Sequence, residues 1–205
     1  MTGEPSTLLY IHGLNSSPRS KKASQLSTLM QTLGLDEHLR VPELHHHPRQ
    51  AIAQLDALIT ELGRPLLVGS SLGGYYATHL AERHGLKALL INPAVMPHRL
   101  FDGYIGTQQN LYSGESWELT HDHVQALAEL EVPAPQDPLR FQVWLQTGDE
   151  TLDYRSAQSY YRACALRIQP GGDHSFQGFT EQLPALLGFA GFAPALLQAI
   201  DRSVL

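Results

Sequence analysis

A serine between two glycines is the residue whose type and spacing most plainly permit chemistry in this chain. Residues 69–73 are Gly-Ser-Ser-Leu-Gly, which places Ser71 at the centre of a Gly-x-Ser-x-Gly pattern. Between a strand and a helix, this pattern forms a tight, strained turn that exposes the serine hydroxyl as a nucleophile. Five residues alone also suit an ordinary glycine-rich turn, so the hypothesis depends on partners elsewhere in the chain.

An acid and a base follow Ser71 in the order that a serine hydrolase needs. A serine hydroxyl becomes nucleophilic when a histidine takes its proton and a carboxylate orients that histidine. Asp149 comes just after the apolar run 141–146, and His174 lies in a glycine-rich loop after the run 166–169. Catalytic groups gather at the carboxyl ends of parallel strands, so we expect nucleophile, orienting carboxylate and general base to meet there. The carboxylates that remain as alternatives to Asp149 are Glu150 and Asp153.

Such a site also needs two backbone N–H groups directed at the oxyanion of the tetrahedral intermediate. The residue after the nucleophile, Leu72, is expected to supply one of them. The second is expected from the sequence His12-Gly13-Leu14, which follows the first apolar run. Gly13 allows a turn that presents the N–H of Leu14 to the site. We expect His12 to brace this loop rather than to act as a second base.

Short apolar runs alternate with helical patterns along the chain, which predicts an α/β fold with a mostly parallel sheet and helices on both faces. The first helix is expected to have Ser17 as its N-cap and Pro18 at its first position. The uncharged segment 182–200 is interpreted as two short helices rather than a membrane span, because it contains Pro184 and Pro194. The predicted strands cover residues 7–11, 39–41, 65–68, 86–91, 141–146 and 166–169. The predicted helices cover 17–33, 52–62, 75–81, 155–163 and 180–190, with another from 194.

The segment from 93 to 138 interrupts this alternation and exceeds an ordinary crossover connection in length. It contains a helical run at 124–130. Within a single domain spanning 1–205, we expect this insertion to form a lid or a pocket wall, with surface packing as the alternative. Its large apolar residues would line an apolar pocket for the substrate, and they are Met96, Phe101, Tyr104, Tyr112 and Trp117.

The composition limits the class of protein. Of the 205 residues, 42% are hydrophobic and 17% are charged, which is typical of a folded globular protein. The formal charge of −6, with 14 Lys plus Arg and no basic run, argues against a nucleic-acid partner. The single cysteine, Cys164, excludes an internal disulfide and fits a reducing compartment. The N-terminal residues have no basic start and no long apolar stretch, so we expect a cytoplasmic protein.

Two histidine-rich runs raise the question of a metal site. Residues 45–47 are His-His-His and residues 121–123 are His-Asp-His, and both residue types are zinc ligands. Neither run has a partner at a ligand spacing such as His-Glu-x-x-His, so we interpret both as solvent-exposed loops and expect no metal. No Gly-x-Gly-x-x-Gly or Walker-type loop occurs, so we expect no cofactor.

Five ordered motifs together carry a family resemblance that extends over nearly the whole chain. They are Tyr-Ile-His-Gly-Leu-Asn-Ser-Ser-Pro at 10–18, Gly-Ser-Ser-Leu-Gly-Gly-Tyr-Tyr-Ala at 69–77, Ile-Asn-Pro-Ala-Val at 91–95, Gln-Thr-Gly-Asp-Glu at 146–150 and Gly-Gly-Asp-His-Ser-Phe at 171–176. The chain resembles the small bacterial YqiA/YcfP-type esterases, which are compact α/β-hydrolases. The resemblance implies an intracellular carboxylic-ester hydrolase with Ser71, Asp149 and His174 as its triad. It departs at residues 110–112, where Asn-Leu-Tyr replaces Asn-Pro-Tyr, and this affects the shape of the lid and the substrate preference.

The sequence therefore predicts a serine carboxylesterase that hydrolyses small to medium acyl esters through an acyl-enzyme intermediate. The nearest alternative is an acyl-CoA thioesterase, for which Arg19, Lys21 and Lys22 could contact the negative charges of CoA. A third alternative is a non-catalytic hydrolase-fold protein that binds a ligand or a partner. It is disfavoured because all three triad residues are present. The sequence predicts no oligomeric state.

Overall fold

A six-stranded sheet forms the centre of the computed structural model, which describes residues 7–193. Its strands are β1 (Leu8–Ile11), β2 (Leu39–Arg40), β3 (Leu66–Ser70), β4 (Ala88–Ile91), β7 (Phe141–Gln146) and β8 (Ala165–Gln169). Their order is β2-β1-β3-β4-β7-β8, and every pairing within this sheet is parallel. The predicted parallel sheet is therefore confirmed. The helix expected from residue 194 lies outside the described residues.

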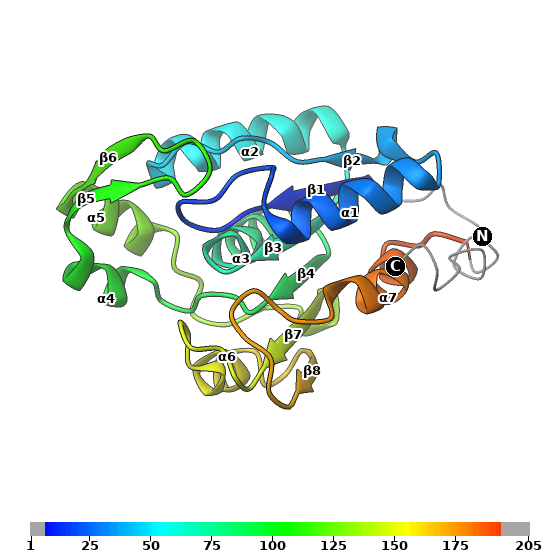
Figure 1. Cartoon of the computed structure of the whole chain (residues 1–205). Helices are drawn as coiled ribbons and strands as arrows, with labels where there is room; N and C mark the ends of the chain where they lie inside the picture. Colours follow the sequence, from blue (N-terminus) through cyan, green and yellow to red (C-terminus); the bar gives the residue numbers. More distant parts are fainter. Residues whose placement is uncertain (1–6, 194–205) are drawn as a thin grey trace.

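Helices cover both faces of the sheet, as predicted. They are α1 (Lys21–Thr32), α2 (Pro48–Leu62), α3 (Leu72–His84), α6 (Tyr154–Tyr160) and α7 (Phe179–Phe189). Successive side chains of a strand point to opposite faces, and β1 shows the result. Leu8 and Tyr10 pack in one core cluster with α1 and α7, whereas Leu9 and Ile11 pack in the other with α2, α3 and α6. In Figure 1, α1 and α7 lie on the near side of the sheet, and α3 lies behind it.

The first helix begins later than the sequence predicts. Ser20 is at the N-cap position and α1 begins at Lys21, so Ser17 is not the cap. The Ser17 hydroxyl accepts a hydrogen bond from the N–H of Arg19 (3.0 Å), and its carbonyl accepts one from the N–H of Ser20 (3.0 Å). The Ser-Pro pair therefore forms a separate turn before the helix, because the residues that favour helix caps also favour turns.

The insertion between β4 and β7 contains strands as well as helices. Its main elements are α4 (His98–Phe101), β5 (Gly106–Gln109), β6 (Ser116–Leu119) and α5 (His121–Glu129). Strands β5 and β6 form an antiparallel hairpin, which the sequence did not predict. Each strand has only four residues, and β5 (Gly-Thr-Gln-Gln) has no large apolar residue, so the pattern that marks a strand is too short to recognise. Figure 1 shows the insertion (green) grouped at the end of the sheet where β1 ends.

Histidines at the start of α2 anchor this insertion. His46 Nδ1 lies 3.2 Å from His123 Nε2, and His47 Nε2 lies 2.8 Å from Asp122 Oδ2. The interpretation of residues 121–123 as an exposed loop is therefore wrong, because they form the first turn of α5 and His123, packed against the other run, is only 6% exposed. Within residues 7–193, no group of three or more His, Cys, Asp or Glu side chains is placed to hold a metal ion.

The imidazole of His123 is held in its neutral form. Its Nδ1 accepts a hydrogen bond from the N–H of Thr120 (3.2 Å), so its proton is on Nε2, which donates to His46 Nδ1. Burial, followed by the nearby His47 and His46, lowers the pKa of His123 to about 4. Protonation of this imidazole at low pH therefore weakens the contact between the insertion and the segment before α2.

None of the helices among the described residues combines the length and apolar character needed to span a bilayer.

The free energy of unfolding is expected to fall as the pH is lowered from about 6.5 to about 4. In this interval the unfolded chain binds a proton at residue 123 and the folded chain does not, so acid favours unfolding. His123→Asn removes this difference in proton binding. Its unfolding free energy, measured with urea at several pH values, should be lower than that of the wild type at pH 7 but should decline less steeply with acid.

The exposed neighbour His121 provides the control, and His121→Asn should follow the wild-type profile. Parallel profiles for His123→Asn and the wild type would contradict the assignment.

Candidate active site

The predicted site residues come together at the carboxyl ends of the strands. The strand order reverses between β1 and β3, because β2 lies on one side of β1 and β3 on the other. Such a switch point leaves a crevice in which α/β proteins bind ligands. The loop beginning at His12 follows β1, and Ser71 follows β3, whereas Asp149 and His174 follow β7 and β8.

Ser71 occupies a strained turn between β3 and α3. Its φ is 56°, a value that is uncommon for residues other than glycine. Hydrogen bonds on both sides hold the turn: the N–H of Ser71 donates to the carbonyl of Ile91 (3.1 Å). The carbonyl of Ser71 accepts from the N–H groups of Gly74 (2.9 Å) and Ala94 (3.0 Å). The surrounding backbone thus compensates for the strain at the serine.

The two glycines of the motif allow close backbone contacts that no side chain would permit. A Cβ at Gly73 would overlap the carbonyl oxygen of Ile11 at the end of β1. A Cβ at Gly69 would overlap the carbonyl oxygen of Gly73. Glycine is therefore required at both positions for α3 to begin directly above the ends of β1 and β3.

The side chains of Ser71, His174 and Asp149 form one hydrogen-bonded series. His174 Nε2 lies 3.0 Å from Ser71 Oγ, and His174 Nδ1 lies 2.8 Å from Asp149 Oδ2 and 3.0 Å from Oδ1. The carboxylate can orient the imidazole so that Nε2 is free to accept the serine proton. The Asp149 side chain is 2% exposed, whereas that of His174 is 23% exposed and remains accessible.

The Asp149 carboxyl is held in its charged form. Burial alone would raise its pKa, but hydrogen bonds from His174 and from the N–H groups of Leu152 (2.8 Å) and Thr151 (2.9 Å) outweigh burial. The pKa of Asp149 therefore lies below its usual value. An ionised carboxylate at this position stabilises the imidazolium that forms when His174 takes a proton.

The two alternative carboxylates have other contacts. Asp153 is the N-cap of α6, where its Oδ1 accepts from the N–H of Arg155 (3.0 Å). Glu150 accepts a hydrogen bond from the backbone N–H of His174 (3.0 Å) and so contacts the loop rather than the imidazole. Among the three candidates, Asp149 alone has a hydrogen bond to the His174 ring.

The two backbone segments expected to supply oxyanion donors lie beside Ser71. Leu72 is the first residue of α3, so its N–H has no acceptor within the helix. Gly13 contacts the nucleophile, since a Cβ there would lie 3.5 Å from Ser71 Oγ. The next residue, Leu14, lines the same cavity as Leu72. The two donors named from the sequence are therefore on neighbouring segments beside Ser71.

His12 holds this loop in place. Its Nδ1 donates to the carbonyl of Gly13 (3.0 Å), and its Nε2 accepts from the N–H of Leu44 (3.3 Å). Burial lowers the pKa of His12, which favours the neutral imidazole that these two bonds require. Both ring nitrogens are occupied, which fits a bracing role rather than that of a base.

Asn92 supports the His174 loop, although the sequence analysis did not assign it a role. It is 3% exposed and has a φ of 40°. Its Nδ2 donates to the carbonyls of Asp173 (3.1 Å) and His174 (3.3 Å), and its Oδ1 accepts from the N–H of Gln146 (3.0 Å). Asparagine tolerates a positive φ, so an asparagine directly after a predicted strand could have indicated a turn that supports the site.

The hairpin of the insertion is hydrogen-bonded to the loop after β1. Asn15 has a φ of 53°, and its Oδ1 accepts from Trp117 Nε1 (2.9 Å) while its Nδ2 donates to Gln108 Oε1 (3.3 Å). Asn110 Nδ2 donates to the carbonyl of Ser16 (3.0 Å). These contacts place β5 and β6 beside the proposed oxyanion donors.

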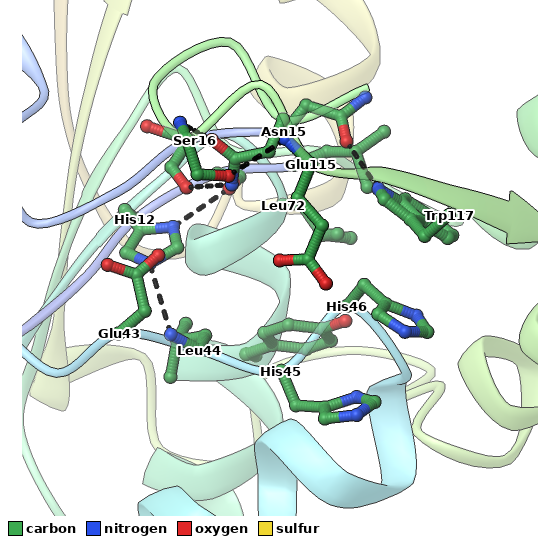
Figure 2. A pocket seen from close by; sticks show the side chains of 15 residues that line it. His12, Asn15, Ser16, Glu43, Leu44, His45, His46, Leu72, Glu115 and Trp117 are labelled. Carbon is green, nitrogen blue, oxygen red and sulfur yellow. Dashed lines mark hydrogen bonds between the residues drawn. The ribbon is translucent and has the colours of Figure 1, made fainter. Parts of the chain in front are cut away.

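A cavity of about 310 Å³ lies between this loop, the start of α3, the segment before α2 and the hairpin. It begins beside the nucleophile, because Gly13, Leu14 and Leu72 line it. Figure 2 shows its polar and aromatic lining residues, which include Asn15, Glu43, His45, His46, Glu115 and Trp117.

Of the five insertion residues expected to line an apolar substrate pocket, Trp117 alone lines this cavity. Met96 lines a separate, much smaller cavity, and Phe101 packs against Tyr104, with 6.4 Å between ring centroids. Tyr104 is 63% exposed and Tyr112 is 39% exposed. The difference has a physical reason: the unpredicted hairpin brings Asn110, Ser113 and Glu115 of its connecting turn to the cavity beside Trp117, whereas Met96, Phe101 and Tyr104 precede the hairpin.

Comparison with known proteins identifies the family and the fold. A family model described as an uncharacterised protein family, UPF0227, matches residues 7–191. A UPF0227 protein of Shewanella woodyi is 27% identical over 191 residues, covering 89% of this chain and 98% of the relative. Another from Pectobacterium carotovorum is 25% identical over 193 residues, covering 89% and 97%.

Solved structures with the same architecture are α/β hydrolases. Mouse alpha/beta hydrolase domain-containing protein 10 is 13% identical, with a TM-score of 0.69 and coverage of 98% of this chain and 92% of that one. Est1E of Butyrivibrio proteoclasticus, with ferulic acid bound, is 14% identical, with a TM-score of 0.67 and coverage of 89% and 86%. A monoacylglycerol lipase of Paleococcus ferrophilus is 14% identical, with a TM-score of 0.63 and coverage of 90% and 93%. The predicted α/β-hydrolase fold is confirmed.

Asn92→Gly is expected to slow the reaction of Ser71 with a fluorophosphonate about tenfold or more. Glycine keeps the positive φ but removes the hydrogen bonds that hold the His174 loop, so the imidazole is less well placed to accept the serine proton. The labelling rate, measured beside the urea unfolding curve, separates poor placement from loss of fold.

Asn92→Asp keeps the size of the side chain and removes its N–H donors. Wild-type labelling rates in both variants would exclude a positioning role for Asn92.

Proposed function

The chain belongs to the UPF0227 family, and from the site that it carries we propose that it is a serine hydrolase that cleaves carboxylic esters. The observation that carries the proposal is the hydrogen-bonded series from Ser71 Oγ through His174 to a buried, ionised Asp149. Ser71 has a strained φ, and His174 and Asp149 reach it from two different strand ends. In this geometry a serine hydroxyl can attack an acyl carbonyl while the histidine takes its proton.

In the proposed mechanism His174 Nε2 accepts the proton of the Ser71 hydroxyl as Oγ attacks the acyl carbonyl. The N–H groups of Leu72 and Leu14 donate to the oxygen that becomes negative, an interaction that strengthens in the transition state. The bond to the alcohol oxygen then breaks, and His174 gives its proton to the departing alcohol. Water, deprotonated by His174, attacks the acyl-enzyme and releases the acid, and Ser71 regains its proton.

Two structural relatives support a carboxylic ester as the substrate. One has ferulic acid, a carboxylic acid, bound to it, and another is a monoacylglycerol lipase. The proposal does not extend to the same substrates, because sequence identity to these proteins is only 14%.

Of the three cations expected to contact CoA in the acyl-CoA thioesterase alternative, Lys21 is exposed, and the other two are held by contacts within the chain. Arg19 donates to the carbonyl of Tyr112 (3.1 Å) and Lys22 donates to the carbonyl of Ser175 (3.0 Å), so both are engaged within the chain. Burial lowers the pKa of Lys22 to about 8, which weakens it as a fixed positive charge.

Ser71→Ala is expected to abolish fluorophosphonate labelling and to reduce ester hydrolysis at least about 10³-fold, because the nucleophile is removed while the rest of the site remains. Labelling is read by intact mass and hydrolysis by release of acid from short-chain esters. Ser70→Ala, at the adjacent variable position, is the matched control and should still be labelled. An unlabelled wild type, or a labelled Ser71→Ala, would exclude the proposal.

Asp149→Asn is expected to lower kcat by about 10³- to 10⁴-fold while the chain stays folded, because the imidazole loses the carboxylate that fixes its tautomer. Asp153→Asn removes a carboxylate of the same size four residues away and should change kcat by less than about threefold. The measurement is kcat as a function of pH for both variants. Equal losses of kcat in the two variants would contradict the role proposed for Asp149.

A further inference from the structure

The position of the cavity relative to Ser71 and His174 indicates which half of an ester could enter it. In the proposed reaction His174 reaches the leaving alcohol oxygen, so the alcohol half of an ester lies on the His174 side of Ser71. Gly13, Leu14 and Leu72, on the segments proposed to hold the oxyanion, line the cavity, whereas neither Ser71 nor His174 lines it. If the proposed function holds, an ester whose carbonyl oxygen faces these segments therefore places its acyl half in the cavity.

Two histidines present N–H donors among the lining residues. His46 Nδ1 accepts from His123 Nε2, so the proton of neutral His46 is on Nε2. His45 Nδ1 accepts from the backbone N–H of His47 (2.9 Å), so the proton of neutral His45 is also on Nε2. Both residues line the cavity. In each, the Nε2–H has no hydrogen-bond partner among residues 7–193, so it is a candidate donor for a ligand.

Tyr76 adds a hydroxyl at the cavity. The residue lines the cavity, and its hydroxyl makes no hydrogen bond to any of residues 7–193. Burial of the residue raises the pKa of Tyr76, so the hydroxyl keeps its proton and can both donate and accept. A polar ligand atom in the cavity could therefore pair with it in either sense.

The acceptors at the cavity are carboxylates. Glu43 and Glu115 line it and are exposed at its mouth, and among the described lining residues none is Lys or Arg. Figure 2 shows both carboxylates among the lining side chains, with the Glu115 chain extending toward His46. An anionic acyl group would therefore be repelled, whereas hydroxyl groups could donate to these oxygens.

We propose that the cavity binds the acyl half of the substrate and that this half carries hydroxyl groups rather than a plain hydrocarbon chain. A hydroxyl both donates and accepts, so it suits the imidazole N–H groups, the Tyr76 hydroxyl and the carboxylates together. A hydrocarbon chain would displace water from all of these groups and pair none of them. A cationic group would suit the carboxylates but leave the N–H donors unpaired.

The test compares kcat/KM for three ethyl esters with the same alcohol: ethyl 3-hydroxybutanoate, ethyl butanoate and ethyl 4-(trimethylammonio)butanoate. The wild type should prefer the hydroxylated ester to ethyl butanoate by about tenfold or more, because a site that binds a hydroxyl discriminates against its absence. Tyr76→Phe should lower this ratio about fivefold or more, and Glu115→Gln should lower it about twofold to fivefold.

Matched controls are Tyr154→Phe and Glu118→Gln, which alter the same groups away from the cavity and should leave the ratio unchanged. Ser71-dependent hydrolysis of ethyl butanoate at an equal or higher rate would overturn this inference and leave the proposed function intact. A preference for the cationic ester would also overturn it, because the carboxylates of Glu43 and Glu115 alone would then determine which acyl group binds. Absence of hydrolysis of all three esters and of Ser71 labelling would overturn the proposed function and this inference with it.

Discussion

The absence of a side chain at Gly73 is the constraint on which the rest of the site depends. The helix that follows Ser71 begins so close to β1 that any Cβ at Gly73 would meet the carbonyl oxygen of Ile11. This contact brings the end of β3 against the loop after β1. Ser71 therefore turns with a positive φ directly beside Gly13, and the N–H groups proposed as oxyanion donors belong to neighbouring residues.

His174 is held in a different way, by polar side chains in place of close packing. The His174 loop has few regular backbone bonds, and Asn92 and Gln146 bind its carbonyls and N–H groups from the ends of β4 and β7. Both side chains are buried, so their hydrogen bonds are strong and costly to lose. Ser71 is fixed by backbone contact, whereas the His174 loop is fixed by a buried polar network.

The residues at strand ends could be predicted from the sequence, because a strand followed by a glycine turn has a local signature. The proximity of Ser71, Asp149 and His174 follows from their places after β3, β7 and β8. The hairpin could not be predicted in this way. Each of its strands has only four residues, and contacts with Asn15, far away in sequence, hold them beside the loop after β1. The polar residues of the cavity wall were missed for the same reason.

The hydrogen bonds between the hairpin and the loop after β1 connect the cavity wall to the segment beside Ser71. Asn15, whose side chain accepts from Trp117, directly follows Leu14 in the chain. A substitution in the hairpin that alters the cavity would therefore also displace the backbone of Leu14. Changes in the wall and changes beside Ser71 are thus mechanically coupled.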